Sequence, residues 1–122
     1  MPKINSRAKG CRGEREWRDM LRAEGYEARR GQQFSGGTDS PDVICGDLPG
    51  LHFEVKLVQN LNVDRVMNEQ AEPDAGDKIP VIAHRKNHSK WLVTLKAEDF
   101  FLILRNSDLE SLSTPSNLRT CR

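Results

Sequence analysis

Apolar and polar residues alternate most regularly in the run LHFEVKL at positions 51–57. The odd positions are all apolar, which predicts a strand over residues 51–58 with one face turned to the core. His52, Glu54 and Lys56 then share the opposite face. Glu54 and Lys56 lie about 7 Å apart along such a strand, so a carboxylate and an amine point the same way.

Helical spacing of apolar residues predicts three helices. Trp17, Met20 and Leu21 indicate a first helix from about Gly10 to Glu24, with Gly25 as its stop. A second helix runs from about residue 62 until Pro73 and Gly76 end it, carried by Val63, Val66, Met67, Gln70 and Ala71. Residues 97–104 have the character of a short closing helix.

Further strands are expected over residues 26–34, 42–45, 79–83 and 91–95, and a polar, basic connection over 84–90. Residues 35–40 are rich in Gly and Ser and read as a loop that leads to Pro41 and Asp42. Residues 46–50 make a turn between two strands, so a hairpin is the natural arrangement. This hairpin brings Asp42 close to Glu54.

The composition allows one domain. With 122 residues and 36% hydrophobic content there is enough apolar surface for one compact core, which we place in residues 1–105. Residues 106–122 are rich in Ser, Thr and Asn, and we expect a flexible tail. We expect a soluble cytoplasmic protein because no apolar run is long enough for a membrane span or a signal peptide. Its three cysteines lack the spacing of a zinc site or a disulfide framework.

Charge is segregated along the chain although the net charge is only +1. Residues 1–33 carry nine basic and five acidic groups, residues 34–77 carry two and nine, and residues 78–105 carry six and two. An acidic centre between basic flanks suits a protein that holds cations at its centre and grips phosphates around it. Chance clustering on a solvated surface is the alternative.

Three carboxylates are candidates for one site. Magnesium prefers oxygen ligands, and Asp42 and Glu54 supply them beside Lys56, which can hold a water or stabilise negative charge. On the first helix Glu14 falls about 60° from Trp17, nearer the apolar face than Glu16. Glu14 is therefore the candidate third acid; its alternative role is a favourable interaction with the helix dipole.

Taken in order, GEREW on an opening helix, a basic strand, SPDVI and HFEVK resemble the PD-(D/E)xK nuclease superfamily, and within it the small Holliday junction resolvases of archaeal and phage type. The resemblance covers about residues 9–104. It implies an α/β fold with a restriction-endonuclease-like core, a central mixed sheet of about five strands flanked by helices. It also implies a homodimer that acts on four-way DNA junctions, as in phage recombination or packaging in a host cytoplasm.

Carried over position by position, the resemblance implies a catalytic lysine at Lys56 and metal ligands at Glu14, Asp42 and Glu54. The carbonyl of Val55 is a further expected ligand. The expected activity is Mg²⁺-dependent hydrolysis of a phosphodiester, with Mn²⁺ able to substitute. Two alternatives stay open: a nuclease of the same superfamily that cuts flaps or duplex DNA, and a DNA-binding module that keeps the fold without chemistry.

Several residues are candidates for contact with DNA. The resemblance makes Arg30 a phosphate contact, and the same basic strand offers Arg29. Gln70 lies on the apolar stripe of the second helix, where it either orients water or phosphate or is a hydrogen-bonded polar residue at the helix edge. The other candidates are two serines of the loop and two basic residues of the later connection: Ser35, Ser40, Arg85 and Lys86.

Overall fold

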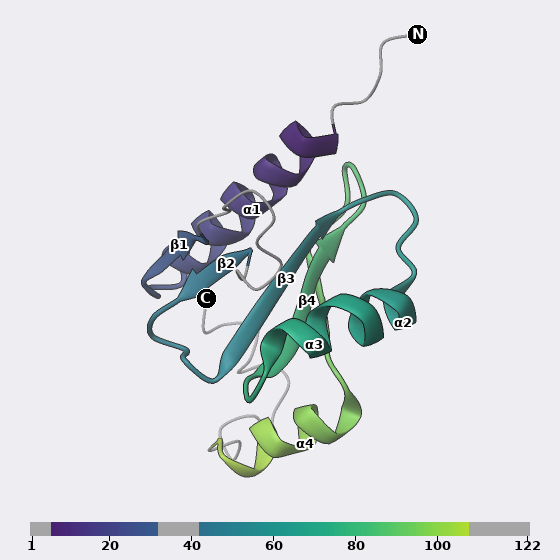
Figure 1. Ribbon diagram of the computed structural model, residues 1–122. Coiled ribbons are helices and arrows are strands. Elements are labelled where there is room, and N and C mark those ends of the chain that lie inside the picture. Colours follow the sequence, from purple (N-terminus) through teal and green to yellow (C-terminus); the bar gives the residue numbers. More distant parts are fainter. Residues whose placement is uncertain (1–5, 32–41, 108–122) are drawn as a thin grey trace, which may run out of the picture.

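The computed structural model describes residues 6–31 and 42–107. Their five strands form one sheet in the order β1-β2-β3-β4-β5, in which β3 and β4 are parallel and the other neighbours antiparallel. The strands are β1 (Ala28–Arg30), β2 (Val43–Cys45), β3 (Leu51–Leu57), β4 (Ile79–Arg85) and β5 (Leu92–Thr94). The mixed five-stranded sheet flanked by helices that the sequence predicts is confirmed (Figure 1).

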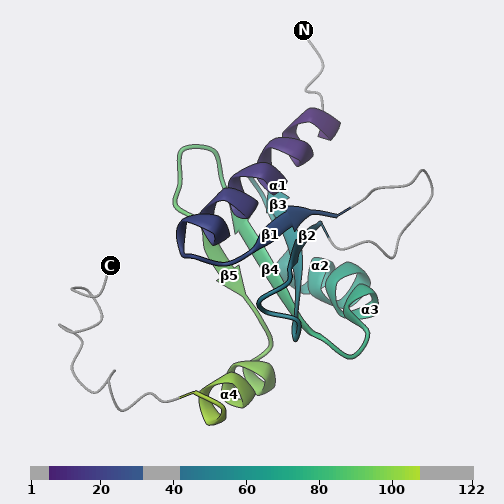
Figure 2. The same ribbon diagram turned by 90° about the vertical axis from the view of Figure 1, so that its left-hand side faces the viewer.

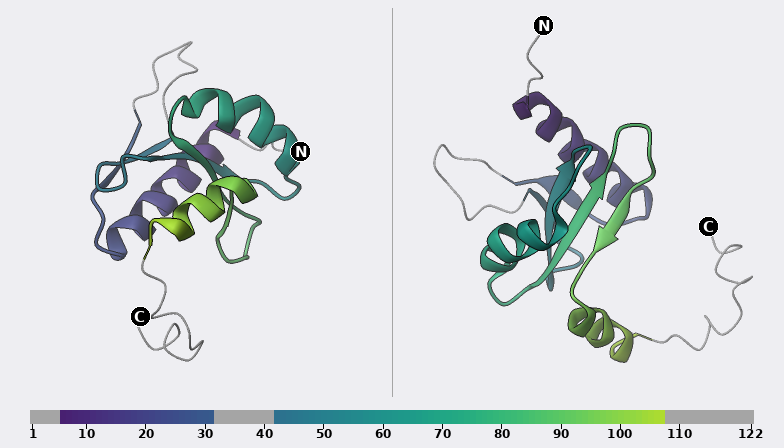
Figure 3. Two further views of the ribbon diagram at one scale, coloured as in Figure 1. Left: turned by 90° about the horizontal axis from the view of Figure 1, so that it is seen from below. Right: turned by 90° about the vertical axis from the view of Figure 1, so that its right-hand side faces the viewer.

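Helices cover both faces of this sheet (Figure 2). Helix α1 (Ser6–Ala23) lies on one face, and the helical segment made of α2 (Val63–Val66), η1 (Met67–Ala71) and α3 (Glu72–Ala75) lies on the other. Helix α4 (Ala97–Arg105) lies at one end of the molecule, beyond the sheet (Figure 3). Residues alternate along β3, so its odd positions face α1 and its even positions face α2, η1 and α3.

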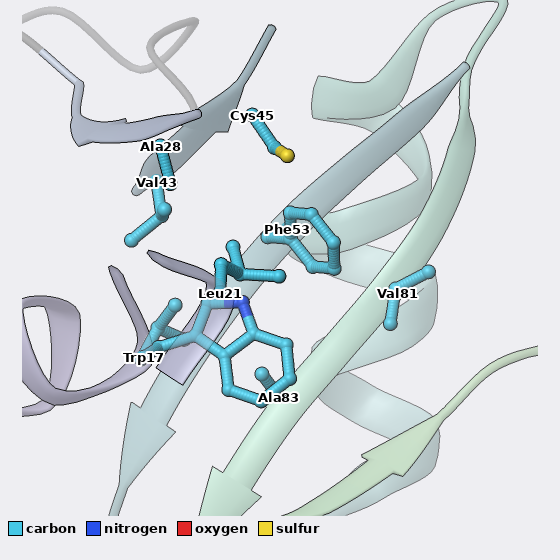
Figure 4. Close-up of a cluster of buried hydrophobic side chains, with 9 residues drawn as sticks. Trp17, Leu21, Ala28, Val43, Cys45, Phe53, Val81 and Ala83 are labelled. Carbon is cyan, nitrogen blue, oxygen red and sulfur yellow. The ribbon is translucent and has the colours of Figure 1, made fainter. Parts of the chain in front are cut away.

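The main core lies between α1 and the sheet. Trp17 packs edge-on against Phe53 (Figure 4), with ring centroids 5.5 Å apart. The ring of Trp91 lies at the same distance from Trp17. The remaining buried side chains of this core come from α1 and four strands: Leu21, Ala28, Val43, Cys45, Val55, Val81 and Ala83. A second core under α2 and η1 contains Val66, Met67, Ala71 and Ile82.

Helix α1 ends as its sequence predicts. Gly25 adopts φ +95°, and the amides of Gly25 and Tyr26 donate to the carbonyls of Arg22 and Leu21. This pair of bonds is a Schellman cap, which needs the left-handed backbone that glycine adopts without strain. The helix begins at Ser6, four residues earlier than predicted. The extra turn was not predicted because residues 6–9 carry no apolar stripe that would mark it.

Two other boundaries differ from the prediction. In the described residues the first strand is shorter than predicted, from Ala28 to Arg30. The second helical segment ends at Gly76 as predicted, although Pro73 does not interrupt it; this proline follows a π turn, where the regular ladder of backbone hydrogen bonds is already broken. Strand β4 continues through Arg85, because pairing with Lys56 and Leu57 of β3 extends the strand into polar residues.

Candidate functional site

The β2–β3 hairpin brings Asp42 and Glu54 together. Val43 pairs with Phe53, and the same antiparallel register places Asp42 opposite Glu54. The Oδ2 atom of Asp42 accepts a hydrogen bond from the backbone N–H of Val55 at 2.8 Å. The hairpin expected from the sequence is confirmed, and it fixes the Asp42 carboxylate beside the strand that carries Glu54 and Lys56.

Four candidate residues act on one another electrostatically. The pKa of Asp42 is raised from 3.8 to about 7, chiefly by burial and then by the negative charges of Glu54 and Glu14. The hydrogen bond from Val55 and the positive charge of Lys56 oppose this rise in pKa. Burial is the largest of these causes, and the charges of Glu54, Glu14 and Lys56 each act on Asp42. A carboxyl in this state ionises readily when a cation arrives.

Glu14 reaches this point from α1. It is buried, with 6% of its surface exposed, whereas Glu16 lies outside the core and pairs with Arg85. The orientation predicted from the helical wheel, Glu14 inward rather than Glu16, is therefore confirmed. The Oε1 atom of Glu14 accepts hydrogen bonds from Nη2 and Nε of Arg30 at 3.0 and 3.1 Å. Arg30 on β1 thus supplies the positive charge that compensates a buried glutamate.

Gly13 allows α1 to approach β3 closely. A Cβ atom at Gly13 would lie 3.1 Å from Cβ of Leu57 and 3.6 Å from Cγ1 of Val55. The first of these distances is tighter than ordinary van der Waals contact. The residue before Glu14 therefore sets how near the helix comes to the strand that carries the other acids.

On the other side of Glu54 lie His52 and Asp74. One ligand atom from each of His52, Glu54 and Asp74 lies within 4.8 Å of the others. The sequence placed His52 on the face of Glu54 but gave it no role, and Asp74 was missed. Its position four residues after Gln70 on the same helical stripe was the available signal. Among the described residues, this trio is the group whose histidine and carboxylate atoms gather most closely for a cation.

The candidate DNA contacts are spread more widely. Arg29 is exposed on β1, and Gln70 is half-buried in the π turn η1. Arg85 donates to both carboxylate oxygens of Glu16, at 2.8 and 2.9 Å, and its guanidinium lies 5.7 Å from the centre of the Trp91 ring. Two candidate serines, Ser35 and Ser40, lie outside the described residues, as does Pro41.

Two polar hollows flank the end of the sheet where the parallel strands β3 and β4 finish. One, of about 410 Å³, is lined by Arg12, Glu16, Arg85, Asn87 and His88. The other, of about 380 Å³, is lined by Gln59, Asn60, Leu61, Asn62 and Lys86. The backbone N–H of Asn87 donates to the side chain of Gln59 at 2.6 Å, which joins the two loops. The basic residues of the predicted connection therefore lie at the Lys56 end of β3.

The donor set suits a hard divalent cation. Asp42 and Glu54 supply carboxylate oxygens within one hairpin, and Glu14 adds a third from the helix that packs on it. Oxygen donors of this kind are the ligands that magnesium and manganese take in proteins. The ligand atoms of these three acids do not gather as closely as those of His52, Glu54 and Asp74, but the charges of Glu54 and Glu14 both raise the pKa of Asp42, and a cation stabilises its ionised form.

Comparisons with known proteins give a likeness to a solved structure. No family model matches the chain, and no curated protein sequence matches it. The solved structure of Hjc, a Holliday junction resolvase from the archaeal hyperthermophile Archaeoglobus fulgidus, is similar, with 24% sequence identity and a TM-score of 0.49. The match covers 71% of this chain and 72% of that chain. A likeness of this degree does not assign the chain to a family.

The fold is a mixed five-stranded sheet with helices on both faces, which is the architecture that the resemblance seen in the sequence implies. Within the described residues, no helix has the length and apolar character needed to cross a membrane.

Proposed function

We propose that the protein is a metal-dependent DNA endonuclease that resolves four-way junctions. One observation carries the proposal: Asp42 is hydrogen-bonded to Val55 and lies close enough to Glu54, Glu14 and Lys56 for all three to shift its pKa. Acids that hold a divalent cation and a lysine beside them are the groups that hydrolysis of a phosphodiester uses.

In this proposal Asp42, Glu54 and the backbone carbonyl of Val55 would hold Mg²⁺, or Mn²⁺ in its place. Glu14 would bind the ion directly or through water. A bound divalent ion lowers the pKa of a coordinated water and neutralises charge on the scissile phosphate. Lys56, on the same strand face as Glu54, orients the attacking water or stabilises the negative charge of the transition state. Arg30 donates two hydrogen bonds to Oε1 of Glu14 and so holds this side chain in place.

The surface around this centre supports binding to a polyanion. Arg29 is exposed on β1, and Lys86 lies at the hollow formed by residues 59–62. Arg12 and Arg85 line the neighbouring hollow, where their charges are partly offset by Glu16. Lysine and arginine side chains at such positions contact phosphates without reading sequence. Gln70, Ser35 and Ser40 are proposed as further contacts.

A homodimer would present two such centres to the two strands of a junction. Support comes from α4, which contains no buried residue although its sequence is largely apolar. Large apolar side chains are exposed on this helix and on the neighbouring strand β5: Phe100, Phe101, Leu102, Leu92 and Val93. Exposed apolar surface of this kind on a small protein is typical of a subunit interface. We place the dimer contact here, within a single nuclease domain of residues 1–105 in the cytoplasm.

The test is cleavage of labelled DNA. The protein is incubated with a four-way junction, a 5′ flap and linear duplex, each with Mg²⁺, Mn²⁺ or EDTA. We expect paired symmetric nicks in the junction with either metal and none in EDTA. Asp42→Asn and Lys56→Gln should abolish cleavage yet still shift the junction in a gel, whereas Asp77→Asn, an exposed acid in the turn before β4, should cut normally.

Each contrary result selects a different reading. Preferred cutting of flaps or duplex would replace the resolvase by another nuclease of the same superfamily. Junction binding without metal-dependent cleavage of any substrate would make the chain a DNA-binding module. If Asp42→Asn cleaves at the rate of the unmodified protein, the proposed centre around Asp42 does not catalyse the reaction.

A further inference from the structure

The imidazole of His52 is buried and incompletely paired. Only 3% of its side-chain surface is exposed, and its Nε2 atom has no hydrogen-bond partner within the described part of the chain. The nearest acidic atom is Oε2 of Glu54 at 3.9 Å, too far for a hydrogen bond. Buried polar atoms without a partner are uncommon because they cost free energy. The unpaired Nε2 atom therefore suggests that a bound ligand pairs with it.

Two carboxylates lie beside this imidazole. Asp74, half-buried on α3, and Glu54 on β3 place oxygens so that all three ligand atoms fall within 4.8 Å of one another. Ligands bound to one cation at about 2.0–2.2 Å lie roughly 3–3.5 Å apart. The three side chains therefore have to draw together by no more than about 2 Å when a cation binds.

We propose that His52, Glu54 and Asp74 form a binding site for a transition-metal dication such as Zn²⁺. The ligand atoms are Nε2 of His52 and one carboxylate oxygen from each acid. The imidazole selects the class of ion, because nitrogen is a good ligand for zinc, whereas magnesium and manganese prefer oxygen ligands. The remaining coordination positions are open to water.

Glu54 belongs to this site and to the proposed nuclease centre. Asp42 lies opposite Glu54 on β2, while His52 and Asp74 lie along β3 and on α3. One carboxylate can bridge two cations through its two oxygens, as in two-metal sites. The site itself does not depend on the proposed nuclease function, since its ligands can be tested by metal binding alone.

The test measures binding of Zn²⁺ to the full chain by calorimetry in the presence of excess Mg²⁺. We expect one tight Zn²⁺ site per chain. Asp74→Asn and His52→Gln should each weaken it roughly tenfold or more, because each removes one ligand. The matched control is Asp77→Asn, which removes the same charge three residues away in the exposed turn and should leave the Zn²⁺ affinity unchanged.

Circular dichroism in EDTA checks that the variants fold, and Asp74→Asn carries the test if the buried His52→Gln does not. Co²⁺ provides a second readout: bound by nitrogen and oxygen it shows only weak visible bands, whereas a cysteine ligand adds an intense sulfur charge-transfer band. Zn²⁺ affinity that is unchanged in Asp74→Asn, the sulfur band, or a site that excess Mg²⁺ empties would each overturn the proposal. If the protein binds Zn²⁺ in this way but cuts no DNA, the proposal of this site stands and only the proposed nuclease function is wrong.

Discussion

The guanidinium of Arg30 and the carboxylate of Glu14 join β1 to α1 through two hydrogen bonds of 3.0 and 3.1 Å to a single oxygen. The pair is unequally buried, since 31% of the arginine side chain is exposed but only 8% of the glutamate. Removing the arginine would therefore leave a buried negative charge beside Asp42, whose pKa the Glu14 charge already raises.

Arg30→Gln is expected to lower the free energy of unfolding by about 1–3 kcal/mol, the typical cost when a buried polar group loses a hydrogen-bond donor. The exposed neighbour Arg29 provides the control, and Arg29→Gln should change stability by less than about 0.5 kcal/mol. Urea denaturation at pH 7.5 measures both. Adding Glu14→Gln to Arg30→Gln should recover part of the loss; equal stability of the two arginine variants would show that the pair is not structural.

Asp42 makes stability depend on pH when no cation is bound. Its pKa is about 7 in the folded chain, against 3.8 for an unperturbed aspartate, so between these values the folded protein holds the proton more firmly than the unfolded chain. Stability should therefore fall as pH rises from about 4 to 7 and then level off. Asp42→Asn cannot titrate and still accepts the bond from Val55. In EDTA, the Asp42→Asn variant should have a larger free energy of unfolding than the parent protein at pH 8. The difference between the two proteins should be smaller at pH 5.

Chemical denaturation of both proteins at pH 5 and pH 8 in EDTA checks this difference. Mg²⁺ or Mn²⁺ should reverse the order at pH 8, because a cation at the proposed centre stabilises only a chain with the carboxylate. A stability gap that stays the same at both pH values would mean that Asp42 is ionised throughout.

Two glycines of α1 should respond oppositely to alanine. A Cβ at Gly10 would meet nothing within 4 Å, so Gly10→Ala should stabilise the protein by about 0.5–1 kcal/mol through helix propensity. Gly13→Ala gains the same propensity but presses on Cβ of Leu57, which belongs to a buried strand and cannot rotate away. We expect it to be less stable than Gly10→Ala and to cleave more slowly, because α1 and Glu14 move outward. Thermal denaturation of the two variants gives the comparison.

The apolar surface of α4 and β5 should control assembly. Phe101, 55% exposed, lies on the proposed dimer contact, so Phe101→Glu should shift the protein from dimer to monomer. Met20 on α1 is exposed to a similar degree, 42%, and Met20→Glu is the control that should stay dimeric. Light scattering after size-exclusion chromatography distinguishes the states. A monomeric parent protein would exclude this contact as a stable interface.

Local pattern was enough to predict most of the elements. The alternation in 51–57 defined β3, the turn at 46–50 defined the hairpin, and Gly25 defined the end of α1. These features depend on neighbours in sequence, where periodicity and backbone preference act directly. The inward position of Glu14 also followed from the helical period alone.

What was missed depends on contacts between distant parts of the chain. Arg30 was expected to contact phosphate, and its pairing with Glu14 depends on how β1 lies against α1. Asp74 was not considered, because only the packing of the second helical segment on the sheet brings it to His52 and Glu54. The extension of β4 to Arg85 came likewise from parallel pairing with β3.

The π turn η1 determines which way Asp74 faces. In a regular α-helix, residues four apart drift by about 40° per step, so Asp74 would lie roughly 80° around the axis from Val66. The wider π turn takes up about one extra residue and cancels most of that drift. Met67, Ala71 and Ala75 thus stay in line on the buried side of the segment, and Asp74 lies beside them, near His52 and Glu54. The unusual turn acts as an angular spacer, without which Asp74 would be rotated relative to the buried residues that precede the turn.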